Sequence, residues 1–359
     1  MSISYVIVVQ KLFFLFRILC IGLGIFLCLK YAEECSRGIR NGILFCIQVL
    51  VPSLFFMMVL SAYLIKSGTA EQIARPLDRL SRRLFLLPYP SLAVIILAMI
   101  GGYPVGARCA EMLYEDGKLS EGDAERTAYI AVCAGPGFLM NFVGRALLGS
   151  PEAGLLLLTA QIISTLILAL LIGRIVKRPQ TETHPQNGII RGKGVLIDAV
   201  SDASRSTFHM CAMVVICTAL IEVIATVSPI PTLTALSSAA IEITSGCAIL
   251  CRRYPLALIA FFIGFGGISV HLQIFAACRK LPIRHGIFVL FRMLQGIITA
   301  GLTYILLMVF PIEVSVFNST EAPLSAARSA TLIGSAALVV SALCFLGSVH
   351  KQRAKMQKN

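Results

Sequence analysis

Long apolar runs, separated by short polar stretches, repeat along almost the whole chain. A helix needs about 20 apolar residues to cross a bilayer, and these runs reach that length. The pattern predicts an all-α, polytopic helical membrane protein with about eight to ten membrane segments. The runs that predict spanning helices are residues 6–29, 41–65, 91–114, 124–148, 153–176, 206–228, 256–279, 286–310 and 324–348.

Two other segments do not fit a simple span. Residues 69–87 carry arginines at helical spacing, which predicts an amphipathic helix at the membrane interface or a hairpin. Residues 232–251 are apolar and rich in small residues, but the polar run from Glu242 to Gly246 interrupts them. That interruption predicts a re-entrant pair of half-helices with a polar tip.

The second half of the chain resembles the first. In one ungapped register identical residues coincide, among them Tyr89 with Tyr254 and Gly102 with Gly267. We therefore expect two related halves with broken helices, a common plan for secondary transporters. The predicted division is an N-terminal helix and loop (1–40), a first membrane repeat (41–176), a polar linker (177–205), a second membrane repeat (206–348) and a basic tail (349–359).

The orientation of the first half has two solutions. The tail after Ser348 is basic and has no acidic residue, which places it in the cytoplasm. If residues 124–148 span the membrane, the repeats are parallel and residues 69–87 lie outside. If residues 124–148 are re-entrant, the repeats are inverted and residues 69–87 lie inside. The Lys and Arg counts fit both arrangements almost equally.

Composition agrees with a membrane protein and narrows the expected partners. The chain has 359 residues, of which 57% are hydrophobic and 14% charged, and its mean hydropathy is +0.85. A soluble domain is about 25% charged. The net charge of +13 comes mostly from short loops and the tail, so we expect no nucleic-acid partner. The expected partners are the lipid bilayer and a small anionic substrate, and a homo-oligomer is left open.

Nothing in the sequence favours an enzyme. The twelve cysteines lie mostly inside apolar runs without paired C-x-x-C spacing, so they predict small buried side chains and no metal site. The P-loop, zinc-protease and nucleophile-elbow motifs are missing. We therefore expect no catalytic activity and no cofactor.

The strongest local feature is a helix-breaking run inside residues 91–114. Broken backbone in a membrane persists only where it is buried in protein or lines a wet cavity, and the freed N–H groups of a half-helix favour an anion. The alternative is close helix packing through small residues. The candidate substrate-binding residues are Gly101, Gly102, Tyr103, Pro104, Gly106 and Arg108, the last as a charged donor.

A matching run in the second half carries polar residues at corresponding places. Its candidates are Gly266, Gly267, Ser269, His271 and Gln273. His271 is a candidate proton carrier, since the charge of a histidine changes near neutral pH. The alternative is a neutral histidine that is hydrogen-bonded inside the bundle.

Other polar groups fall at membrane depth. The polar tip in residues 232–251 is a candidate site because a hairpin tip exposes backbone groups, and its residues are Glu242, Thr244, Ser245 and Gly246. The run after residue 134 adds Gly135, Pro136 and Asn141. Arg145, Glu222 and Arg292 are interpreted either as helix-end residues or as members of structural ion pairs.

Several of these motifs together resemble a known family. The chain is similar to the YlbJ-type sporulation integral membrane proteins, which are themselves similar to nucleoside-recognition (Gate) membrane domains. The resemblance rests on Pro52-Ser-Leu-Phe55, Gly101-Gly-Tyr-Pro-Val-Gly106, Glu111 with Leu113-Tyr114 and Gly117, Glu125-Arg126, Gly135-Pro136, Gly149-Ser-Pro151, Glu242 with Thr244-Ser-Gly246, and Gly264-Phe-Gly-Gly267 with Ser269-Val-His271.

The resemblance implies a function and a location. It implies transport of dipicolinic acid from the mother cell to the forespore, across the mother-cell-derived outer forespore membrane. It also implies that the glycine-rich breaks and the hairpin tip form the substrate path. Two alternatives remain open: a sporulation scaffold that transports nothing, and a nucleoside-type transporter.

Overall fold

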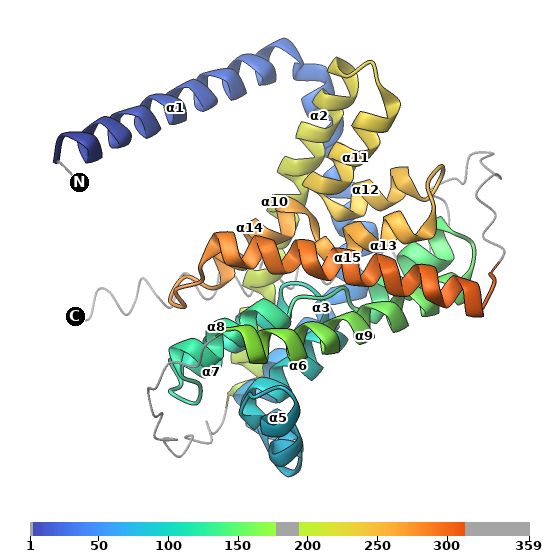
Figure 1. Ribbon diagram of the computed structural model, residues 1–359. Helices are drawn as coiled ribbons and strands as arrows, with labels where there is room; N and C mark the ends of the chain where they lie inside the picture. Colours follow the sequence, from blue (N-terminus) through green and yellow to red (C-terminus); the bar gives the residue numbers. More distant parts are fainter. Residues whose placement is uncertain (1–2, 177–193, 313–359) are drawn as a thin grey trace.

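The chain is a polytopic helical membrane protein. The computed structural model describes residues 3–176 and 194–312, and every regular element in these ranges is a helix (Figure 1). Four helices are long and apolar enough to cross a membrane, and six if each bent helix pair counts as one span. The predicted span 324–348, the tail and most of the linker lie outside the described residues. Several other predicted spans are pairs of half-length helices.

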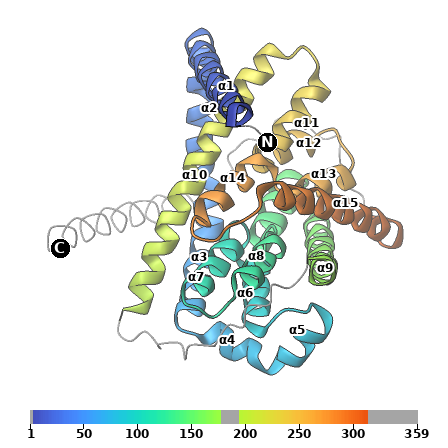
Figure 2. The same cartoon turned by 60° about the vertical axis from the view of Figure 1, so that its left-hand side comes forward.

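The N-terminal helices include two that pack along one side of the long helix α10 (Val195–Val227). The N-terminal part contains α1 (Ile3–Lys30), α2 (Ala32–Phe45), the π-helix η1 (Cys46–Leu50) and α3 (Val51–Lys66). Helices α2 and α3 pack along α10, which runs the height of the molecule in Figure 2, and we call this contact the α3–α10 seam.

Small residues bring α2 close to α10. A Cβ added to Gly42 of α2 would lie 2.9 Å from the Cα of Val215 on α10, so the two backbones nearly touch. Near the C-terminal end of α10, Glu222 accepts hydrogen bonds from Arg37 and Asn41, both at 3.2 Å. Glu222 is therefore a member of a structural ion pair, one of the two sequence interpretations.

Within the predicted segment 69–87, residues 69–84 form a bent helix that we call the surface helix. Its parts are α4 (Thr69–Ala74), the 3-10 turn η2 (Arg75–Leu77) and α5 (Asp78–Leu84). Together they make an angle of 100° with the next helix, α6 (Tyr89–Gly101). The segment lies across the end of the bundle in Figures 1 and 2, as expected of the surface-helix alternative.

The run 91–114 is a helical hairpin rather than a straight span. Helix α6 and α7 (Val105–Glu115) pack against each other, and a Cβ on Gly106 would lie 2.5 Å from the Cβ of Ala98. Both outer ends return to the surface helix: the Tyr89 N–H donates to Asp78 at 3.0 Å, and Lys118 pairs with Glu71. The prediction of a span was wrong because the helix break reverses the chain.

Residues 121–147 run the full length of the bundle, with one helix interruption between residues 130 and 137. Helix α8 (Glu121–Ile130) and the π-helix η3 (Gly137–Leu147) lie antiparallel to α9 (Pro151–Ile175). Arg126 of α8 and Arg174 of α9 bond to the neighbouring carbonyls of Leu86 and Leu84, at 3.3 and 3.0 Å. The re-entrant alternative for 124–148 is therefore wrong, because α8 begins where α9 ends.

The second half contains a matching hairpin and a matching interrupted helix. The hairpin predicted in residues 232–251 is confirmed as α11 (Pro231–Ile241) and α12 (Ile243–Leu250), which pack against each other. It is followed by α13 (Leu256–Phe265) and α14 (Gly267–Ala277), which together form one 22-residue span. Helix α15 (His285–Val309) then packs on both α13 and α9.

The two hairpins enter from opposite ends of α10. At the start of α10, Asp202 pairs with Lys66 at 2.7 Å, directly before the surface helix and the first hairpin. The second hairpin follows the end of α10 at Ser228. This is an inverted arrangement of elements, in which α6–α7 corresponds to α11–α12 and α8–η3 to α13–α14. The sequence prediction that a continuous segment 124–148 requires parallel repeats was therefore wrong, because it counted α6–α7 as a span and these helices form a hairpin. The register that aligns Gly102 with Gly267 does not describe this correspondence.

Candidate functional site

Each hairpin tip meets the interruption of a spanning segment. In the first half, a Cβ on Gly102 would lie 2.9 Å from the backbone N of Gly135. In the second half, a Cβ on Gly267 would lie 3.2 Å from the backbone N of Ile243. Gly102, Gly266 and Gly267 have φ of 76°, 88° and 74°, values that L side chains rarely adopt.

A pocket lies between these tips and breaks, and we call it the tip pocket. Its cavity volume is about 30 Å³, enough for one or two water molecules. Residues from both halves line it: Leu50, Leu54, Tyr103, Gly135, Phe138, Met210, Val214, Glu242, Ile243, Thr244, Val270 and Gln273. The fold therefore brings together Tyr103, Gly135, Glu242, Thr244 and Gln273, all of them sequence candidates.

Glu242 is the N-cap residue of α12, the second helix of the second hairpin. Its carboxylate accepts hydrogen bonds from the Thr244 N–H at 3.0 Å, the Thr244 hydroxyl at 2.8 Å and the Ser245 N–H at 2.6 Å. Only 2% of the residue is exposed. The N–H groups expected to receive a substrate anion are thus bonded to the chain's own carboxylate in this conformation.

The polar residues of α14 are bonded to one another or to the backbone. Gln273 donates to the Ser269 hydroxyl at 3.1 Å, and both are buried. His271 bonds to the Phe265 carbonyl at 2.9 Å, and its ring meets Phe265 and Phe288 edge-on. His271 does not line the tip pocket. Its surroundings match a histidine held inside the bundle, and the proton-carrier role stays a prediction.

Tyr103 ties the first hairpin to the second half. Its hydroxyl donates to the carbonyl of Ile263 on α13, and its ring lines the tip pocket. The next residue, Pro104, faces a different pocket. The Tyr103-Pro104 pair therefore separates two cavities that lie along the α3–α10 seam.

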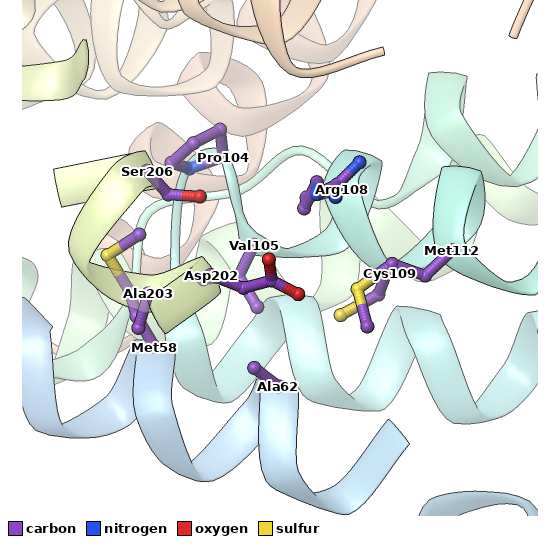
Figure 3. Close-up of a pocket in the computed structure, with 10 residues that line it drawn as sticks. All are labelled: Met58, Ala62, Pro104, Val105, Arg108, Cys109, Met112, Asp202, Ala203 and Ser206. Atoms are coloured by element: carbon purple, nitrogen blue, oxygen red, sulfur yellow. The ribbon is translucent and has the colours of Figure 1, made fainter. Parts of the chain in front are cut away.

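The second cavity, which we call the base pocket, contains Arg108 (Figure 3). Arg108 pairs with Glu111 on its own helix and lies across the pocket from Asp202 of α10. The cavity volume is about 20 Å³. Arg108 thus does not share a cavity with Glu242, Thr244 and Gln273 in this conformation.

Four other candidates play different parts. Gly106 and Gly246 are packing glycines, since each lies against an alanine of the other helix in its hairpin. Pro136 precedes η3 and belongs to the first interruption. Asn141 is exposed on η3 and does not line the tip pocket.

The sequence interpretation of Arg292 was wrong. It lies two turns inside α15, fully buried at 0% exposure, so it is no helix-end residue. Within the described residues its guanidinium bonds only to carbonyls, those of Tyr129 at 2.9 Å and of Val132, and its Nε has no partner. These carbonyls lie at the end of α8, where the helix dipole favours a cation. The available signal was an arginine inside a 25-residue apolar helix.

A second ionic cluster joins α8 to the loop before α15. The Glu125 carboxylate accepts bonds from the Arg284 guanidinium, at 2.9 Å from both Nε and Nη2, and from the Tyr129 hydroxyl. Two charge-assisted hydrogen bonds from one guanidinium therefore fix α8 against this loop.

No metal-binding cluster occurs in residues 3–176 and 194–312, where no group of three or more His, Cys, Asp or Glu side chains could hold an ion.

Comparison with known proteins gives one similarity. The chain is 23% identical over 316 residues to the sporulation integral membrane protein YlbJ of Bacillus subtilis (strain 168). That alignment covers 76% of this chain and 77% of the relative. No family profile matches the chain, and no solved structure matches it.

Proposed function

We propose that this protein is a membrane transporter of a small anionic metabolite and not an enzyme. By similarity, the substrate is dipicolinic acid, moved from the mother cell to the forespore across the outer forespore membrane. The observation that carries the proposal is the tip pocket, where two hairpin tips and two interrupted spans meet. Binding sites of secondary transporters are commonly built from such broken helices.

The placement of the hairpins favours transport over a scaffold. Broken helices are costly in an apolar interior unless they line a cavity or are buried in protein. A scaffold has no need for two of them facing one another. Because the hairpins enter from opposite ends of α10, movement of one tip or the other opens the pocket to one end of the molecule.

Arg292 supports an anionic substrate. Its guanidinium lies behind the interruption that contributes Gly135 to the tip pocket. A buried cation whose partners are carbonyls is only partly neutralised. A carboxylate that entered through the interruption would complete its coordination with a charge-assisted bond.

The structure represents a closed conformation in this scheme. The cavity admits water but no aromatic dicarboxylate, so a substrate enters only after a hairpin tip moves. The bond from Tyr103 to the Ile263 carbonyl holds the first tip in place and must break in that step.

The direct test is uptake of dipicolinate into liposomes that contain the purified full chain. We expect Arg292→Gln to lower uptake by about 10- to 100-fold, because loss of one charge-assisted hydrogen bond costs about 1.5–3 kcal/mol. Arg292→Lys keeps the charge but loses the planar fork, so its uptake should be intermediate. Arg145→Gln, on the exposed surface of η3, is the matched control and should transport normally.

Two outcomes contradict the proposal. Wild-type uptake no greater than that of protein-free liposomes would exclude transport and leave the scaffold alternative. The scaffold alternative also predicts normal dipicolinate content in spores that produce the protein with its polar site residues substituted. Equal uptake by the Arg292→Gln and Arg145→Gln variants, at equal amounts of monodisperse protein, would show that Arg292 does not bind the substrate carboxylate.

A neutral nucleoside is the second candidate substrate. The charged group that lines the tip pocket is a carboxylate, Glu242, accompanied by Thr244, Gln273 and the rings of Tyr103 and Phe138. Hydroxyl, amide and aromatic groups suit a neutral, hydroxylated heterocycle. Competition in the same liposomes separates the candidates: excess uridine lowers dipicolinate uptake only if the pocket accepts nucleosides.

A further inference from the structure

The surface helix, residues 69–84, has three distinct faces. The face toward the protein contains Ala70, Ala74 and Ser81, which are 6%, 1% and 0% exposed. The Ser81 hydroxyl donates to the Leu87 carbonyl at 2.8 Å and so fixes the end of the segment against the body. This face accounts for the attachment of the helix but uses none of its large apolar or basic side chains.

A second face is apolar and exposed. Ile73, Leu77, Leu80 and Leu84 follow one another at intervals of four, three and four positions, so they form one stripe on a helix. Their exposed fractions are 64%, 40%, 50% and 39%. A stripe of this kind is stable when it contacts hydrocarbon rather than water.

The third face is basic. Arg75, Arg79, Arg82 and Arg83 are all exposed and fall on the side of the helix away from the leucine stripe.

The nearby acids are already engaged. Asp78 pairs with Arg82 at 2.8 Å and accepts the Tyr89 N–H, while Glu71 pairs with Lys118. Within the described residues, no ion pair involves Arg75, Arg79 or Arg83.

The direction of the segment fits a membrane interface. It turns by 100° into α6, so it lies across the helix that descends into the bundle. A helix in that direction, with apolar and basic sides, places its stripe among acyl chains and its charges at headgroup level.

We propose that the surface helix binds anionic phospholipid headgroups through Arg75, Arg79, Arg82 and Arg83, with the leucine stripe inserted in the acyl-chain region. The bilayer is the occupant because exposed cations lie beside an exposed apolar stripe, and an anionic lipid supplies both complementary parts. The inference rests on this segment alone and is independent of transport.

The experiment uses the absence of tryptophan from the chain. Leu80→Trp gives the full-length protein a single indole fluorophore in the middle of the stripe. The protein is reconstituted in phosphatidylcholine vesicles that contain an equal fraction of acyl-brominated phosphatidylglycerol or acyl-brominated phosphatidylcholine. Leu155→Trp, on the exposed surface of α9, is the matched control away from the arginines.

We expect the fluorescence of the Leu80→Trp variant to be quenched by bromine, and more strongly by the brominated anionic lipid. About 1 kcal/mol for each arginine near an anionic surface corresponds to about fivefold local enrichment of that lipid. Replacement of the four arginines by glutamine in this variant should remove the preference but leave the quenching. The Leu155→Trp variant should show equal quenching by both lipids.

Two results overturn the proposal. Equal quenching of the Leu80→Trp variant by both lipids shows that the arginines do not select anionic headgroups. Quenching of the same variant by aqueous iodide but by neither lipid shows that the stripe faces water. Uptake measured on the same vesicles reports separately on transport.

Discussion

Glycine has two different roles within a few residues of the first hairpin. Gly102 has φ of 76° and ψ of −169°, a conformation essentially reserved for glycine, and it touches Gly135. Gly106 is helical and lets α7 approach Ala98 of α6. From the sequence, a helix break and close helix packing were alternative explanations of this motif. In the structure both apply: Gly102 breaks the helix, and Gly106 allows close packing.

Gly102→Ala should therefore destabilise the protein more than Gly68→Ala. Gly68 also has a positive φ, 75°, but a Cβ there meets no atom within 4 Å. Its replacement carries only the left-handed backbone cost of about 1–2 kcal/mol. Gly102→Ala adds a contact with the Gly135 backbone N at 2.9 Å, and its ψ of −169° lies outside the left-handed helical region that Gly68 occupies. Thermal unfolding in detergent compares the two, and equal losses would show that neither difference destabilises the protein.

At the residue scale, side-chain partners could not be read from the sequence. The polar tip was recognisable, yet only the fold shows that Glu242 bonds to the N–H groups of Thr244 and Ser245. Arg292 looked like a helix-end residue or an ion-pair member, and its carbonyl partners are about 160 positions away in the chain. Such partners depend on which segments the fold brings together.

At the scale of elements, length and apolar character did not distinguish a span from a hairpin. Residues 91–114 and 124–148 are both long enough to cross and both contain glycine and proline. The first reverses because its halves pack on each other, while the second continues along α9. Only the neighbours of each segment decide between the two outcomes.

The contact of α8 with the loop before α15 should stabilise the fold. The Glu125 carboxylate accepts two hydrogen bonds from the Arg284 guanidinium, each at 2.9 Å. Bidentate, charge-assisted hydrogen bonds of this kind are about twice as strong as neutral ones. We expect Glu125→Gln to lower Tm in detergent, because the amide keeps the size of the side chain but loses its charge.

The control for this measurement is Glu121→Gln, which alters an exposed carboxylate on the same helix. Its Tm difference from wild type should be small. A Tm loss in Glu125→Gln no greater than that in Glu121→Gln would contradict the role of the Glu125–Arg284 contact.

At the scale of the whole molecule, the bases of the two hairpins lie at opposite ends and so distinguish the two membrane faces. The basic surface helix, the start of α10 and the outer ends of the first hairpin lie at one end. The base of the second hairpin lies at the other end, where Ser228 and Arg253 line a common pocket. From the positive-inside tendency we expect the end with the surface helix to face the cytoplasm.

Labelling of single cysteines on a cysteine-free background tests this topology. The protein is produced in the cytoplasmic membrane of cells that do not sporulate. A membrane-impermeant maleimide added to these intact cells should label Arg253→Cys, while Gly68→Cys and Asp116→Cys should react only after the membrane is permeabilised. The reason is that residues 68 and 116 flank the surface helix and first hairpin, and residue 253 flanks the second. Labelling of all three from one side would contradict the inverted arrangement.

The sequence by itself determined the membrane-protein class, the places where helices break and the hairpin in residues 232–251, because these follow from local composition and from glycine and proline. It did not determine whether residues 69–87 form a surface helix or a hairpin, that residues 91–114 reverse, which halves correspond or which five candidates share a pocket. Those features depend on packing between segments more than 100 positions apart, and the tertiary structure alone decided them.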